Sequence, residues 1–154
     1  MTHDIPTVPQ DDPSETIMAA LAHGMDGYPE KAAALFEPFV KGGPTTTVGL
    51  CAALAEMSAI GPRKALPEGA TFGLLVLDAR TGQTADIAEA PAGVRFAAQF
   101  STAWANGQQD TAYALFRALV EPEDEQAAAD LAEGIRALFD MAVVSLNEMT
   151  GRTA

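Results

Sequence analysis

Apolar side chains recur at helical spacing along most of this chain. Between residues 29 and 40 they follow an i, i+3, i+4, i+7, i+8 stripe, which places them on one face of a helix. Similar spacing runs up to a break at Asp26-Gly27 and returns in a third stretch after the glycines and proline of "KGGPTTT". The first part of the chain, residues 12–61, therefore predicts three amphipathic helices.

The second part of the chain has a similar layout. Between residues 91 and 151, three further stretches carry helical spacing, with breaks at Asn106-Gly107 and at Pro122. Acidic side chains crowd residues 121–125, where they suit the positive end of the dipole of the last and long helix. We expect three more helices here.

The segment between these two parts follows a different pattern. Residues 70–90 hold the apolar run "FGLLVLD", then a turn cluster, then a weaker alternating stretch, which is typical of a β-hairpin. A strand this apolar needs cover on both faces, and a hairpin alone is marginal in water. We therefore expect it to lie on the helices or to pair its free edge with another chain, which makes Leu74 and Val76 candidate interface residues.

These patterns predict a mainly α-helical single domain over residues 12–154. It has about six helices in two roughly equivalent three-helix halves joined by the β-hairpin. Residues 1–11 carry prolines and no periodic apolar pattern, so we interpret them as a mobile leader. A length of 154 residues is usual for one domain, and the alanine-rich hydrophobic content of 48% favours helices.

An internal echo relates the two halves at a shift of 80 residues. The matched positions are Gly27, Ala32 and Phe36 in the first half and Gly107, Ala112 and Phe116 in the second. This spacing resembles the second half of a tetratricopeptide repeat, and the resemblance implies protein or peptide binding without catalysis. The leading-helix positions of that repeat are not matched, and its period of about 34 residues is absent. We favour the alternative of two helical hairpins with glycine turns that solve the same packing problem.

Charge and cysteine content narrow the function. The chain has 21 acidic and nine basic residues, a net charge of -12 and a pI near 4.3, so it repels phosphate backbones and anionic lipid. We expect no binding to nucleic acid or membranes. No apolar stretch reaches the roughly 20 residues that span a bilayer, and the first residues do not resemble a signal peptide. With Cys51 as the single cysteine, we expect a reducing, cytoplasmic location.

Candidate chemistry is sparse. His23 and Asp26 have metal-ligand side chains but no third ligand nearby in sequence. His23 is also the one base in the body of the chain for a serine or cysteine nucleophile, and none of these lies in a nucleophile motif. The glycines of "KGGPTTT" lack the lysine-serine ending of a phosphate-binding loop. We therefore expect no catalytic residue, metal or cofactor.

Three hypotheses for function follow. The favoured one is a small non-enzymatic interaction, scaffold or regulatory protein that self-associates or binds an unknown protein partner. Tyr28, Trp104 and Tyr113, near the two turns, join the hairpin residues as candidate interface residues, although Trp104 also has core spacing.

The second hypothesis is a small-ligand binder or enzyme with an apolar pocket between the two halves. The candidate lining residues are Phe36, Phe96, Phe100, Phe116 and Phe139. The third hypothesis, an acidic decoy that imitates nucleic acid, rests on the net charge alone.

Overall fold

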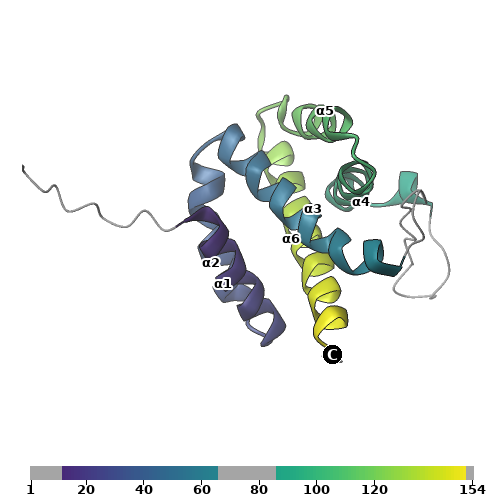
Figure 1. Ribbon diagram of the computed structural model, residues 1–154. Coiled ribbons are helices and arrows are strands. Elements are labelled where there is room, and N and C mark those ends of the chain that lie inside the picture. Colours follow the sequence, from purple (N-terminus) through teal and green to yellow (C-terminus); the bar gives the residue numbers. More distant parts are fainter. Residues whose placement is uncertain (1–11, 66–85, 152–154) are drawn as a thin grey trace, which may run out of the picture.

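A computed structural model describes residues 12–65 and 86–151 of the chain, and these residues form helices (Figure 1). The α-helices are α1 (Pro13–Met25), α2 (Pro29–Lys41), α3 (Pro44–Ala65), α4 (Ala92–Ala105), α5 (Gln109–Val120) and α6 (Glu125–Thr150). A short 3-10 helix, η1 (Ile87–Glu89), precedes α4. The mainly α class with six α-helices in the described residues confirms that part of the prediction.

The predicted joining β-hairpin is wrong, since the described part of the chain contains no strand. The end of the predicted hairpin, residues 86–90, holds η1 instead. Asp86 Oδ1 accepts a hydrogen bond from the Ala88 amide at 2.9 Å, so this aspartate starts a helical turn and does not belong to an alternating strand. The rest of the predicted hairpin, and the predicted leader at residues 1–11, lie outside the described residues.

The central pair of the fold is α3 and α6, which pack along each other (Figure 1). The α1–α2 pair lies on one side of them and the α4–α5 pair on the other. One hydrophobic core receives side chains from all six α-helices, and its fully buried large members include Leu21, Leu50, Leu54, Phe100 and Leu138. Burial of these apolar surfaces is the main force that holds the helices together.

The third helix continues beyond residue 61, where its sequence pattern ends, and it reaches Ala65. Pro62 lies inside it without ending it. The Gly61 amide donates to Ser145 Oγ of α6 at 3.1 Å, so contact between the two central helices supports this part of α3. Tertiary packing here overrides the local stop signal.

The turns that end α1 and α4 have the same conformation. Gly27 and Gly107 adopt left-handed φ angles of +88° and +75°, which glycine reaches without steric cost. In both turns, the amide of the next residue donates to the carbonyl five residues before it at 2.8 Å, as in a Schellman motif. The 80-residue echo in the sequence therefore corresponds to a shared turn geometry.

Beyond these turns the two halves pack differently. Helix α4 lies against both central helices, whereas α1 lies mainly against α2 and α6. Trp104 Nε1 of α4 donates to Glu56 Oε2 of α3 at 2.8 Å, and Arg63 Nη1 donates to the other Glu56 oxygen at 2.7 Å. The two halves therefore differ in how their first helices pack on the central pair, because an echo in turn residues does not determine which helix faces meet.

Candidate functional site

The five phenylalanines of the predicted inter-half pocket are core residues, each at most 6% exposed. They form two separate groups. Phe36 meets Phe139 edge to face with ring centroids 5.5 Å apart, and Phe96 lies 5.3 Å from Phe100 and 6.5 Å from Phe116. The structure therefore does not gather the five rings around one cavity.

The predicted interface aromatics lie at different places. Tyr28 is 49% exposed at the α1–α2 turn, where the Lys31 ammonium stands 4.7 Å from its ring centroid. Trp104 is partly buried and meets Tyr113 edge to face at 6.2 Å on the α4–α5 side. Leu74 and Val76 lie outside the described residues. The described candidates therefore form no common patch.

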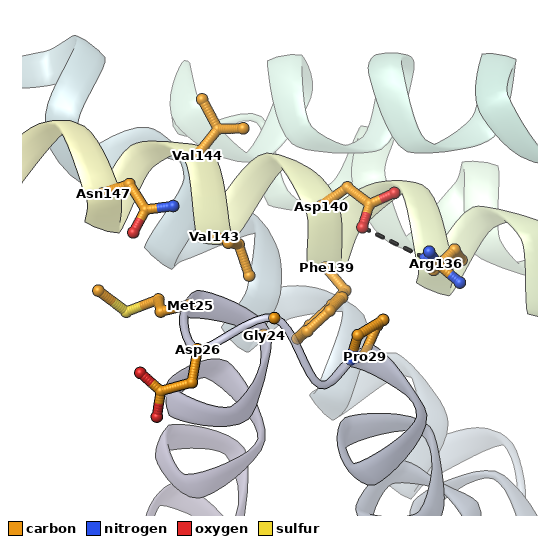
Figure 2. A pocket seen from close by; sticks show the side chains of 11 residues that line it. Gly24, Met25, Asp26, Pro29, Arg136, Phe139, Asp140, Val143, Val144 and Asn147 are labelled. Atoms are coloured by element: carbon orange, nitrogen blue, oxygen red, sulfur yellow. Dashed lines mark hydrogen bonds and ion pairs between the residues drawn. The ribbon is translucent and has the colours of Figure 1, made fainter. Parts of the chain in front are cut away.

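A groove between α6 and the α1–α2 pair is an extended candidate site among the described residues, and we call it the α6 groove. It consists of two adjoining hollows of about 840 and 170 Å³ that share Pro29, Arg136 and Phe139. The larger hollow is shown in Figure 2, and its other lining residues are Gly24, Met25, Asp26, Gly27, Asp140, Val143, Val144 and Asn147. The smaller one is also lined by Ala33, Phe36, Glu37, Val40, Ala132 and Ile135.

The floor of the α6 groove depends on a close approach at Gly24. A Cβ atom added there would overlap the Phe139 ring and lie 2.8 Å from Val143 Cγ2, so the turn reaches α6 because this position has no side chain. The Phe139 ring fills the space (Figure 2), and Phe36 of α2 packs edge to face against it. The groove therefore has a firm apolar floor made by buried rings.

Polar groups stand along α6 at both ends of the larger hollow. Near one end, Arg136 Nε donates to Asp140 Oδ1 at 3.2 Å, and both side chains are more than half exposed. Asn147 lies at the other end (Figure 2), and its Oδ1 is the one buried side-chain polar atom among the described residues without a hydrogen-bond partner. An unmet buried acceptor costs about 1–3 kcal/mol, and rotation of the Asn147 amide toward a hydrogen-bond donor in the hollow would remove this cost.

Two exposed apolar side chains border the α6 groove. Val40 of α2 is 41% exposed, and Val144 of α6 is 56% exposed, the largest fraction among the large apolar side chains that the structure describes. Val144 also borders a hollow of about 320 Å³ on the other side of α6, against Pro62 and Met141. The C-terminal half of α6 is therefore a ridge on which the apolar side chain of Val144 stands between two depressions.

The groups with nucleophilic or metal-binding chemistry lie away from this groove or are engaged elsewhere. Across residues 12–65 and 86–151, no three His, Cys, Asp or Glu side chains gather to hold a metal ion. The hydroxyls of Ser58 and Ser101 donate to carbonyls of their own helices at 2.8 and 3.2 Å. Cys51 is fully buried, and burial raises the pKa of its thiol from 9.0 to about 12.

Burial of Cys51 predicts that stability falls as the pH rises above 9. The unfolded thiol ionises near pH 9.0 and the folded one near pH 12, so the folded state binds more protons between these values. Once the unfolded thiol is ionised, the free energy of unfolding should fall by about 1.4 kcal/mol per pH unit through this residue. Urea unfolding at pH 9.5 and 10.5, with wild type and Cys51→Ala, measures this loss because other titrating groups are common to both. An equal loss in the two proteins would contradict the prediction.

Sequence reasoning missed the α6 groove, although one signal for it is present. Residues 142–146 place Ala142, Val143, Val144 and Leu146 close together in α6, an apolar arc wider than a single packed face needs. The structure uses Ala142 for the core and leaves Val144 exposed. The sequence gives no such signal for Asn147, because the lack of a hydrogen-bond donor for its Oδ1 depends on how the helices pack.

Comparisons of this chain with protein-family models, with curated proteins and with solved structures find no match. None of the helices in the described segments is long and apolar enough to cross a membrane. The functional interpretation therefore rests on the geometry of the α6 groove.

Proposed function

We propose that this protein is a small non-enzymatic interaction protein and that the α6 groove receives a segment of its partner. The observation that carries this proposal is Val144, an apolar side chain exposed in the C-terminal half of α6, at the rim of the hollow whose floor is Phe139. A bound segment that covers Val144 and Val40 would remove exposed apolar surface from water. It would also bring a donor within reach of Asn147.

The polar groups of the groove support binding better than catalysis. Arg136 and Asp140 are exposed and pair with each other, so water screens the charges of both side chains. Catalytic electrostatic stabilisation works best in a site that excludes water. Asn147 does not ionise. These groups suit recognition of a partner's surface.

Replacing Val144 with glutamine is expected to weaken partner binding at least tenfold while leaving the fold intact. The change removes the exposed apolar contact from the ridge, and glutamine is a better helix former than valine. The probes are peptides of random sequence displayed on phage and selected against the whole protein. Their affinities for wild type and Val144→Gln are then measured with synthetic copies.

Met18→Gln is the matched control, because Met18 is 46% exposed on α1 and lies outside the lining of the α6 groove. Amide NMR shifts of the protein should move along residues 132–147 and at the α1–α2 turn when a selected peptide is added. Selected peptides that bind Val144→Gln as well as wild type, or that shift other regions, would contradict the proposed site. A library that yields no binder would also count against it.

Self-association, the other expectation from the sequence, requires the partner segment to come from a second copy. Each copy carries a net charge of -12, which opposes close approach of two chains. Light scattering over a concentration series measures the molecular mass. A dimer that becomes a monomer in Val144→Gln, but not in Met18→Gln, would assign the second copy as the occupant of the α6 groove.

A further inference from the structure

We infer that the segment received by the α6 groove is a basic amphipathic helix of another protein. This inference rests on the proposed function of the groove and adds the chemistry of the partner. Three features of the described residues carry it: the helical lining of the groove, its length along α6, and the charges at its edges.

The helical lining selects a helical partner. Both walls of the α6 groove come from helices and the short turn between α1 and α2, and helices pair their backbone groups internally. An extended segment laid in such a groove would find no free strand edge, and its own amides and carbonyls would lose water without gaining partners. A helix pairs these groups within itself and presents only side chains to the groove.

The length of the groove sets the length of the partner helix. The α6 residues that line it run from Ala132 to Asn147. At about 1.5 Å per residue this is about 22 Å, which matches a helix of about 15 residues or four turns. Such a helix has apolar side chains at i, i+4, i+7 and i+11, which would meet the face of α6 that carries Phe139 and Val143, with Val144 at the rim (Figure 2).

The charges at the groove edges select a basic partner. Asp26 and Glu37 stand on the α1–α2 side, and Asp140 stands on the α6 side. Glu148 follows along the α6 ridge, where it lines the adjoining hollow. Two of these carboxylates already have cation partners, since Glu37 pairs with Lys41 and Asp140 pairs with Arg136. The four carboxylates still outnumber these two cations, on a chain that already carries -12. Lysines and arginines that flank an apolar stripe would meet carboxylates on both sides.

Asn147 adds a polar contact at one end of the groove. Its buried Oδ1 lacks a donor, and its side chain lines the larger hollow (Figure 2). A lysine or glutamine in the last turn of the partner helix can donate to this oxygen once the amide turns toward it. The same groove is unsuited to an acidic helix, whose carboxylates would face like charges at the edges.

Three labelled peptides of 16 residues test the inference on the whole protein. All carry leucines at helical spacing; one has lysines on its polar face, the second has glutamates, and the third is the lysine peptide with two central prolines that prevent a helix. Fluorescence anisotropy gives the affinities at low and moderate salt. The lysine peptide should bind at least tenfold more tightly than the other two, and more weakly as salt rises.

Two protein variants locate the binding. Val144→Gln should weaken the lysine peptide at least tenfold. Glu148→Lys should weaken it several-fold, whereas Glu121→Lys, an equal charge reversal in the exposed α5–α6 loop, should change it much less. Circular dichroism confirms that each variant is folded.

The outcomes separate the inference from the function on which it rests. Equal binding of the lysine and glutamate peptides, both sensitive to Val144→Gln, would overturn the basic partner and keep the groove. Equal binding of the proline peptide would overturn the helical partner. If the lysine peptide bound Val144→Gln as tightly as wild type, its binding would reflect general electrostatic attraction to an acidic protein. That result would overturn both the basic helical partner and the proposed function of the groove. Failure of all three peptides, with library peptides still bound at the groove, would overturn the inference alone.

Discussion

Replacing Phe100 with alanine is expected to lower the free energy of unfolding by about 3–5 kcal/mol. The Phe100 ring of α4 is fully buried. Its centroid lies 5.3 Å from that of the Phe96 ring and 6.2 Å from that of the stacked Trp104 ring. Its removal leaves a cavity where α4 meets the central helices, and rigid helices close such a space only in part.

Urea unfolding followed by circular dichroism measures the effect of Phe100→Ala. Tyr113→Ala is the control, since this ring is 38% exposed and meets Trp104 in an edge-to-face contact, so its loss should cost about 1 kcal/mol or less. A cost at Phe100 as small as that at Tyr113 would show that this part of the core is loosely packed.

Replacing Gly93 with alanine is expected to destabilise the protein by about 1–3 kcal/mol, although alanine is the better helix former. A Cβ atom at Gly93 would lie 2.5 Å from the Asp130 carbonyl oxygen and 2.6 Å from Glu133 Cβ. The nearer of these atoms, the Asp130 carbonyl oxygen, belongs to the backbone of α6, so it can move away only if α4 and α6 separate.

Gly49→Ala is the matched control and should change stability in the opposite direction. Gly49 lies inside α3, is exposed, and has no atom within 4 Å of an added Cβ. Alanine should therefore stabilise the protein by about 0.5–1 kcal/mol through helix propensity alone. Both free energies come from the same urea titrations. Stabilisation by both changes would mean that α4 and α6 are farther apart at Gly93 than described.

Local signals allowed much of the helical fold to be predicted. The glycines at positions 27 and 107 end helices through a left-handed turn, and Asp124 caps α6 by accepting from the Ala127 amide at 2.8 Å. Such contacts span only a few residues, so a sequence pattern contains them. The error at residues 86–90 arose because a short apolar and polar stretch reads equally well as a strand or a helical turn.

The arrangement of the helices and the candidate site were beyond sequence reasoning. Spacing alone predicts that Phe36 and Phe139 are buried, but nothing local indicates that they meet each other and not the other three rings. The same holds for Val144, whose exposure depends on where the α1–α2 turn stops against α6. The close approach of α1 to Phe139 depends on the missing side chain at Gly24, whose role is visible only when the Phe139 ring lies beside it.

The hydrogen bond from Trp104 to Glu56 determines what intrinsic fluorescence reports in this protein. Trp104 is the single tryptophan, and its indole on α4 is hydrogen-bonded to α3. Helix α4 lies on the other side of the central helices from the α1–α2 pair (Figure 1). Its emission should therefore follow separation of α4 from α3 and remain unchanged when a ligand fills the α6 groove. Loosening of the α1–α2 pair from α6 would also leave the tryptophan emission unchanged. A dye placed on the α1–α2 pair, compared with tryptophan emission during unfolding, would reveal whether the two sides of the molecule come apart together.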